Sequence, residues 1–486
     1  MYELIYPTVD LFLYDLRDGL GQSDKEVGTN RRKFWQKIDP AIIDLQTSKE
    51  NPEKELVKLH DQKFPEPFLD GRYFALQIGD TYFLQVDASD HTTKDAPTPE
   101  KDPPRSLVQL AKLKNLVINK LNHHEKSGEI DPDKLGTLGQ TWLVWGRATA
   151  GNTTQDHLRN IAQACFPYLT PNQSWKPNFT EIETKVGELV GARVFEYTQT
   201  PKNWTADLTK FSQENYHLVI LLFPDNDSTS MAEIKQRMQK ITFDLVKLFA
   251  YRHKIIWSYW NSRRLKAELK KDAQQMEDLR NQIQGYQKHS FNLDRLQAKL
   301  TESLPMLAEY STKLNQMSSQ GHTIKINLEN YQKRLAKIIK DQQNCKDENG
   351  QSASLDVDLA PFQEFITTAR ERYQQQISMD YEGLSSVLTI LENLTRTIDT
   401  LVNIERTRAE NRLNNTIAIA GLGLAASSSV ASLVSTQVRQ TKDADSLARI
   451  PVVEGFAYTV AISLTIVVMG VVGTIGLREL LRKLRK

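Results

Sequence analysis

The sequence predicts a cytosolic α+β domain, arranged as an α/β sandwich, followed by long coiled-coil stalk helices and a two-helix transmembrane hairpin. Three observations predict this fold class. Strand and helix patterns alternate over residues 1–250, apolar residues recur at heptad-like spacing over residues 251–413, and two long uncharged stretches lie near the C-terminus. The mean hydropathy of −0.49 therefore combines a polar body with an apolar tail.

Residues 1–250 carry the signals of a mixed sheet with helices. Residues 4–16 (LIYPTVDLFLYDL) predict a strand, and RYFALQI and TYFLQVDA predict a hairpin because Gly79-Asp80 between them suits a tight turn. Residues 216–225 (YHLVILLFPD) are apolar enough for a central strand. Further strands are expected at TWLVWG and at 192–200, and helices at 106–121 and 157–169.

Residues 251–344 predict a helical hairpin, and residues 355–413 predict a stalk helix. In the hairpin, apolar residues follow steps of three and four, with Gln, Lys and Glu between them. The polar and small residues 318–321 (SSQG) predict its turn, and a second helix is expected over 324–340. A third apolar stripe begins after Pro361 and leads toward the first uncharged stretch. Such a stripe must be buried on the hairpin or on copies of itself.

The two uncharged stretches predict membrane-spanning helices. Residues 456–478 are uncharged up to Leu477, long enough to cross a hydrocarbon core of roughly 30 Å. The basic tail 479–486 has the composition of a cytosolic flank. Residues 414–438 form the other stretch, which leaves 439–455 as a short external loop. The sequence thus predicts a multi-pass protein of the inner cell membrane with both termini in the cytosol.

The charge balance and the cysteines exclude several classes of protein. The chain has 486 residues, and Lys+Arg 62 against Asp+Glu 60 gives a net charge of +2, so no nucleic-acid partner is expected. The basic runs at 30–33 (NRRK) and Arg263-Arg264 are expected to be solvated faces. Cys165 and Cys345 are too few and too far apart for a disulfide framework or a zinc ribbon.

Motifs of common enzyme and cofactor sites do not occur in this sequence. It contains no Walker A motif, no H-E-x-x-H, no G-x-S-x-G and no EF-hand loop. His123-His124 lacks the i, i+4 spacing of a metal pair and is expected at the surface. We therefore expect a protein that is not an enzyme and has no resident cofactor. A transported or regulatory cation, of an identity that the sequence does not give, is compatible with this expectation.

The small residues of the stretch 414–438 allow three interpretations. Glycine and serine permit close packing between helices, or they form the polar face of a pore. The run IAIAGLGLAAS also imitates a dinucleotide-binding fingerprint, but the following βαβ units that such a site needs are missing. Under the pore interpretation, the lining residues are Asn414, Asn415, Gly421, Leu424, Ser428, Ser432, Ser435 and Gln437. The acidic residues expected at the external mouth are Asp443, Asp445 and Glu454, which three basic residues of the same loop offset.

The order of these parts resembles the CorA family of divalent-cation transporters. The resemblance covers nearly the whole chain as architecture, and it implies a homopentamer whose first spans line a central pore. In that family a Gly-Met-Asn tripeptide at the outer end of the first span holds a hydrated cation. The corresponding residues 432–440 read SLVSTQVRQ here, and Gly-Met-Asn occurs nowhere in the sequence. Magnesium selectivity is therefore not implied.

The expected function is an oligomeric CorA-like channel or transporter for ions, with divalent cations as candidates. Its cytosolic domain would gate the pore through the stalk helices. The expected partners are the lipid bilayer, further copies of the chain in a homopentamer, and an unidentified cytosolic ligand or protein. The alternative is a membrane-anchored coiled-coil scaffold or signalling protein without transport activity, in which the serines serve packing alone.

Overall fold

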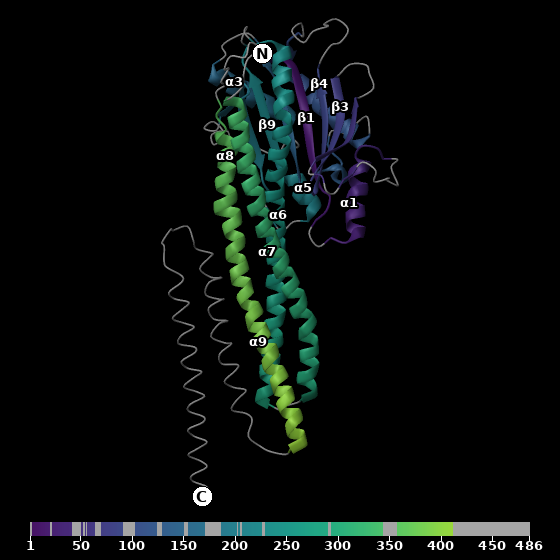
Figure 1. Ribbon diagram of the computed structural model, residues 1–486, viewed down its shortest axis with the longest axis vertical. Helices are drawn as coiled ribbons and strands as arrows, with labels where there is room; N and C mark the ends of the chain where they lie inside the picture. Colours follow the sequence, from purple (N-terminus) through teal and green to yellow (C-terminus); the bar gives the residue numbers. More distant parts are fainter. Residues whose placement is uncertain are drawn as a thin grey trace. The chain divides into compact units, whose positions relative to one another are not determined.

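The computed structural model describes most of the chain up to Asn411. The described residues are 2–411 without 20–21, 41–49, 52–53, 55, 64–69, 91–102, 124–128, 150–153, 171–185, 202, 205–206, 226–228, 290–292 and 344–356. Every statement of structure below concerns these residues. Figure 1 shows their helices and strands.

A mixed sheet of nine strands is the central feature of the N-terminal region (Figure 1). Its strand order is β2-β3-β4-β1-β6-β9-β8-β7, and the short β5 pairs with the start of β1. Neighbouring strands are antiparallel except β6 and β9, which are parallel. The strands are β1 (Glu3–Leu16), β2 (Leu56–Lys63), β3 (Asp70–Ile78), β4 (Thr81–Ser89), β5 (Arg105–Ser106), β6 (Gly139–Ala148), β7 (Val186–Leu189), β8 (Ala192–Gln199) and β9 (Tyr216–Phe223).

Several strands form where the sequence pattern predicts them. The segments predicted over 4–16, 192–200 and 216–225 are strands β1, β8 and β9. The predicted turn joins β3 to β4, and Gly79 adopts a φ of 56°, which glycine reaches without steric cost. Strand β9 lies between β6 and β8, and all of its residues are buried, as its apolar sequence predicts.

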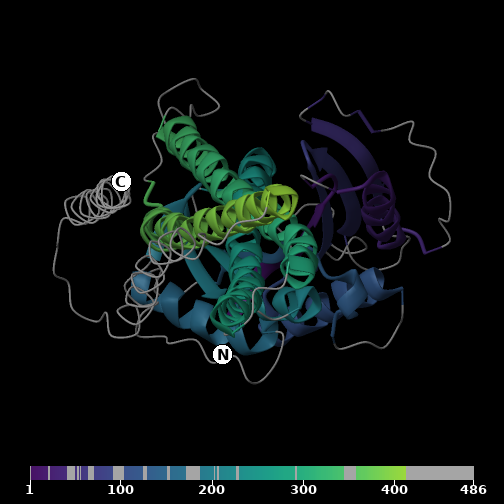
Figure 2. The same ribbon diagram turned by 90° about the horizontal axis from the view of Figure 1, so that it is seen from below.

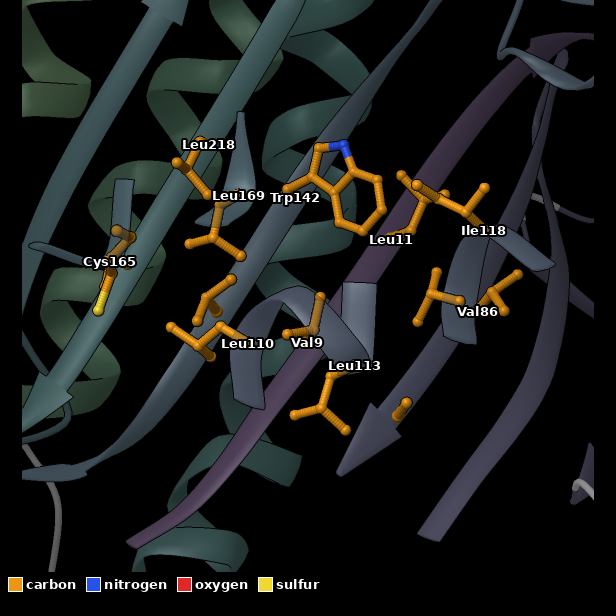
Figure 3. Packing of buried hydrophobic residues seen from close by; sticks show 14 of the residues in the cluster. Val9, Leu11, Val86, Leu110, Leu113, Ile118, Trp142, Cys165, Leu169 and Leu218 are labelled. Carbon is orange, nitrogen blue, oxygen red and sulfur yellow. The ribbon is translucent and has the colours of Figure 1, made fainter. Parts of the chain in front are cut away.

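One face of the sheet packs against helices α2 (Val108–Asn122) and α3 (Gln155–Leu169). Successive side chains of a strand point to opposite faces, so alternate residues of β1, such as Val9 and Leu11, belong to this core. Figure 3 shows Leu110 and Leu113 of α2 near Val9, and Cys165 of α3 on the side of the cluster where Leu218 lies. This apolar layer contains most of the buried aliphatic side chains of the sheet.

Helix α6 (Met231–His289) packs on the opposite face of the sheet. The hydroxyl of Tyr14 on β1 donates a hydrogen bond to the carbonyl oxygen of Val246 at 3.1 Å. One turn further along α6, the ring of Phe249 lies 4.9 Å from that of His217 on β9. His253, a further turn on, contacts Thr141 of β6. These contacts recur at helical spacing, so one face of α6 covers strands β1, β6 and β9.

The remaining helices include two short ones near the sheet, two long helices, and three further short segments. Helix α1 (Asp24–Gln36) begins with a capping box, in which Ser23 and Glu26 exchange hydrogen bonds. Helix α5 (Leu208–Glu214) precedes β9. Helix α7 (Leu293–Gln343), helix α8 (Ala360–Thr367), the π-helical segment η3 (Thr368–Gln374) and helix α9 (Gln375–Asn411) complete the chain, together with the 3-10 turn η2 (Pro132–Lys134). Helices α6, α7 and α9 lie side by side (Figures 1 and 2).

The turn of the helical hairpin predicted at 318–321 is wrong, because these residues lie inside α7. Helix α6 ends at His289 and α7 begins at Leu293, so the connection falls at 290–292. Gly321 fits within the helix because it contacts another one: a Cβ on it would lie 3.4 Å from Cγ2 of Ile377. A small residue at a helix contact can therefore imitate a turn signal in the sequence.

The chain divides into two compact units. The first contains residues 1–264 and 319–377, which include the sheet, and the second contains 265–318 and 378–486. In the described part of the second unit, the hydroxyl of Tyr310 donates to the carbonyl oxygen of Leu384 at 2.9 Å. Lys313 pairs with Asp272 at 2.8 Å. Segments of three helices thus hold this unit together.

No described helix is long and apolar enough to cross a membrane. Helices α6, α7 and α9 have the length, but charged residues interrupt their apolar positions every few residues. The predicted fold class, with its two-helix transmembrane hairpin, is therefore corrected to a mixed nine-stranded sheet with long helices.

The same finding corrects the predicted location in the inner cell membrane with a multi-pass topology. The segments on which these predictions were based are 414–438, 439–455, 456–478 and 479–486. All four lie outside the described residues.

Candidate functional site

The predicted pore and mouth residues all lie outside the part of the chain that the structure describes. The described residues instead bring together a group that the sequence analysis did not select. We call it the buried polar network, and it consists of Thr141, Glu196, His217, Arg252 and His253. These side chains come from β6, β8, β9 and α6, and they lie between the sheet and that helix.

Hydrogen bonds connect four of these side chains in a row. The carboxylate Oε1 of Glu196 lies 2.9 Å from Nε2 of His217. Nδ1 of His217 lies 2.9 Å from Oγ1 of Thr141, which in turn lies 2.8 Å from Nε2 of His253. The two histidines and the threonine are fully buried, with 0% of their surface exposed. Water therefore does not compete for these bonds.

The sheet register accounts for this arrangement. Thr141 and His217 are direct partners in the parallel pair of β6 and β9. Glu196 lies two residues from Thr198, the residue opposite His217 in the antiparallel pair of β8 and β9, so it reaches His217 diagonally. Gly139 lets α6 approach, because a Cβ there would lie 2.2 Å from Nδ1 of His253. Any larger residue at 139 would push His253 away from the sheet.

Only one direction of proton donation satisfies the row when both histidines are neutral. Nε2–H of His217 donates to the Glu196 carboxylate, so Nδ1 of His217 accepts the hydroxyl proton of Thr141. The oxygen of Thr141 then accepts from Nε2–H of His253. Burial, with a contribution from the charge of Arg252, lowers the pKa of both histidines well below the ordinary value, which keeps them neutral.

Arg252 extends the network from the sheet to helix α8. Its Nε lies 3.7 Å from Oε1 of Glu196, and its guanidinium carbon lies 4.9 Å from the centre of the Phe365 ring. Only 3% of its surface is exposed. A buried guanidinium needs an opposite charge and a polarisable neighbour, and this one has both. The carboxylate and the aromatic ring therefore hold it from two sides.

Some polar atoms near the network have no hydrogen-bond partner among the described residues. Both side-chain atoms of Asn215, a fully buried residue, are unsatisfied, as are Nδ1 of His253 and Nε of Arg252. Asn215 and His253 both approach Gly139. Buried polar groups are rarely left unsatisfied in native proteins, so these atoms are the places in the network where a further hydrogen-bond partner would be favourable.

A second buried group lies on the same face of the sheet. The amide nitrogen of Gln85 donates to Oδ1 of Asp10 at 2.7 Å and to Oδ2 of Asp87 at 3.0 Å. Trp145 also donates to Asp10, at 3.2 Å, and Arg72 pairs with Asp87. Burial, aided by the charge of Asp87, raises the pKa of Asp10 to about 8. Asp10 therefore keeps its proton to a higher pH than an exposed aspartate does.

The network has the order of groups found in acid–base–nucleophile sites, since a carboxylate orients a histidine that contacts a hydroxyl. Thr141 and His217 are nevertheless enclosed on every side, so no substrate reaches the hydroxyl in this conformation. No group of three or more His, Cys, Asp or Glu side chains suited to a metal ion occurs within the described ranges. The geometry favours a role in joining helix to sheet.

The basic runs and the histidine pair of the sequence differ in their contacts and their exposure. Arg31 of the NRRK run forms a two-pronged ion pair with Glu50 rather than a solvated face. Arg263 and Arg264 lie over the rings of Tyr259 and Trp260. His123 is exposed at the end of α2, as predicted, and its neighbour lies outside the described residues.

No protein-family model, curated protein or solved structure matches this chain. Its function is therefore argued from the geometry alone. One sequence signal could have pointed to the network: His217 is the one ionisable residue inside an otherwise apolar strand, YHLVILLF, apart from the tyrosine at its start. A polar side chain in a fully buried strand requires a partner, and that partner had to come from outside the strand.

Proposed function

We propose that this chain couples a binding or sensing event in its sheet unit to the long helices, as a signalling or scaffold protein without catalytic activity. Helix α6 is the coupling element. It contributes Arg252 and His253 to the buried polar network, and the same helix continues to His289, beyond the first unit. A rigid element that carries two discrete arrangements is what coupling between distant sites requires.

The continuity of α6 is the observation that carries this proposal. Leu265, Leu269 and Met276 follow on the same helix and are buried in the second unit. A displacement of His253 from the sheet therefore involves a helix with buried side chains in both units. Because packed helices resist bending, such a displacement is transmitted along the axis rather than absorbed at one residue.

The unsatisfied atoms of the network support the same proposal. A fully satisfied polar core would hold α6 in a single position, whereas Asn215 and His253 retain unused donors and acceptors. A ligand or partner that alters the sheet near these residues changes the balance of a network that is already incomplete. Self-association as a homopentamer and ion transport stay predictions that the described residues do not test.

Hydrogen–deuterium exchange in a Thr141→Val variant tests the proposal. Valine has nearly the same shape but leaves Nδ1 of His217 and Nε2 of His253 without their shared partner. Each buried group left unsatisfied costs about 1–3 kcal/mol, so the contact between α6 and the sheet weakens by roughly 2–6 kcal/mol. We expect faster exchange in α6 at residues 245–260 and also at 265–276.

Thr8→Val is the matched control. Thr8 is a buried threonine of the same sheet, and its hydroxyl contacts Ser89 and the carbonyl oxygen of Tyr6 rather than α6. We expect no change of exchange at 265–276 in this variant. Faster exchange confined to residues before 264 in the Thr141 variant, or an equal effect of both substitutions, would show that α6 does not couple the two units.

A further inference from the structure

The segment η3 interrupts the third helix with π-helical hydrogen bonding. The amide of Gln375 donates to the carbonyl oxygen of Arg370, five residues earlier, whereas at the end of α8 the amide of Thr368 donates to Glu364, four residues earlier. A π-helical turn holds one residue more than an α-helical turn, and such turns occur often at functional sites. Helices α8 and α9 therefore continue one another with an inserted residue between them.

The contacts on either side of η3 show why the inserted residue is needed. Arg252 of α6 contacts Phe365, and Tyr259 of α6 stacks on Tyr373 with ring centres 4.3 Å apart. The α6 residues are seven positions apart, and their partners are eight positions apart. Seven residues bring an α-helix back to about the same face, whereas eight overshoot by roughly 80°. The π-helical turn absorbs the eighth residue, so Phe365 and Tyr373 both face α6.

The spacing becomes regular again after η3. In the second unit Lys266 of α6 pairs with Asp380 of α9. Each of these residues lies seven positions beyond the Tyr259–Tyr373 pair, as two α-helices in fixed register require. The irregularity is thus confined to η3. Trp204, which precedes α5, packs edge-on against both rings of this pair. Its ring centre lies 4.8 Å from that of Tyr259 and 6.0 Å from that of Tyr373, so it contacts both partners of the stacked pair.

We propose that η3 is a register switch, in which conversion of its π-helical turn to α-helix turns α9 by about 100° and moves it along its axis by about 1.5 Å. This inference rests on the proposed function in one respect, because the change of register is the movement that the helices would transmit. In the second register Arg372 replaces Tyr373 on the Tyr259 ring. An arginine over a tyrosine ring is a favourable contact.

The second register also buries a residue that the first leaves exposed. Met379 has 57% of its surface exposed, although it is a large apolar residue in a helix that packs on two others. In the second register Met379 occupies the position that the buried Asp380 occupies in the first. The same change replaces the buried Ile377 and Leu384 by Gln376 and Gly383. The first register is therefore the more stable one, and the second becomes populated only when a ligand, a partner or a substitution stabilises it.

Exchanging adjacent residues tests the switch, because the exchange moves the apolar stripe by one position without changing composition. The swap variant carries Q376I/I377Q, G383L/L384G and T397I/I398T. We expect it to fold, with a melting temperature within about 5 °C of the wild type by circular dichroism. A cysteine introduced by Met379→Cys, in a Cys345→Ser background, should react about tenfold more slowly with a maleimide in the swap variant than without the swap.

A one-residue deletion provides the control. Deleting Glu371 alone makes the helix α-helical throughout while Tyr373 still faces Tyr259, so we expect this variant to be as stable as the wild type. In the variant that combines the swap with the deletion, the apolar stripe is displaced by one position and η3 has no extra residue with which to correct it. We expect its melting temperature to lie more than about 10 °C below that of the wild type.

Two outcomes overturn the inference. If the deletion alone destabilises the protein strongly, η3 is not a removable insertion. If the swap variant melts as low as the swap with the deletion, η3 cannot convert. The exchange experiment on Thr141→Val is independent of both outcomes, so failure of the switch and failure of coupling through α6 are distinguishable.

Discussion

The neutral histidines of the buried polar network make the stability of the sheet unit depend on acid pH. Burial lowers the pKa of His217 and His253 well below the ordinary value of 6.5. Above about pH 6.5 both are neutral in the folded and the unfolded chain, so they add no pH dependence. Below that pH the unfolded chain binds a proton at each histidine and the folded chain does not. The stability that they contribute is thus present above pH 6.5 and lost as the pH falls.

The magnitude follows from the number of protons. One proton bound only by the unfolded state lowers the free energy of unfolding by about 1.4 kcal/mol for each pH unit, and two lower it by about 2.7 kcal/mol. A His253→Gln variant retains an amide N–H near the position of Nε2, so it can still donate to Thr141. We expect its free energy of unfolding to fall less steeply with decreasing pH between about pH 6 and pH 5, by about 1.4 kcal/mol per pH unit.

Urea denaturation followed by tryptophan fluorescence measures this difference. All seven tryptophans precede Arg264, so the signal reports on the unit that contains the sheet. Other titrating groups, such as Asp10, occur in both proteins and cancel in the comparison. Parallel curves for the wild type and His253→Gln would refute the reasoning, because they would mean that His253 takes up its proton in the folded state as easily as in the unfolded chain.

Two further predictions concern the other buried charges. The pKa of Asp10 is about 8 in the folded state and lies above its unfolded value of 3.8. The wild type therefore loses about 1.4 kcal/mol of stability per pH unit as the pH rises from about 5 to about 7, and the loss levels off above about pH 8. Asp10→Asn should remove that dependence in urea titrations; an unchanged slope would contradict the assignment of the proton to Asp10. Lys37, 1% exposed, pairs with Asp15 at 2.6 Å, and Lys37→Met should cost about 3–5 kcal/mol because it leaves the carboxylate buried alone. The Asp15→Asn/Lys37→Met double variant should recover part of this loss. If Lys37→Met alone is as stable as the wild type, the Lys37–Asp15 pair makes no net contribution to the free energy of unfolding.

Local patterns were sufficient where one residue type and one spacing decide the structure. The apolar run at 216–225 forms a buried strand because a strand enclosed on both faces tolerates few polar side chains. Gly79-Asp80 forms a turn because glycine reaches positive φ without a steric penalty. The apolar residues at steps of three and four in 251–344 likewise lie in long helices. In each case the physical cause lies within a few neighbouring residues.

Only the tertiary structure decided the turn of the helical hairpin and the composition of the candidate site. Residues 318–321 resemble a turn in sequence, but they lie inside α7, where Gly321 meets Ile377 of another helix. Thr141 and His253 are 112 residues apart in the chain, and they meet because a strand register and a helix position coincide. The inserted residue of η3 exists only relative to the spacing of contacts on α6. The sequence by itself determined the long helices and most of the long strands, through the periodicity of burial. The pairing of those segments decided the site, because hydrogen bonds between distant residues leave no periodic trace in a sequence.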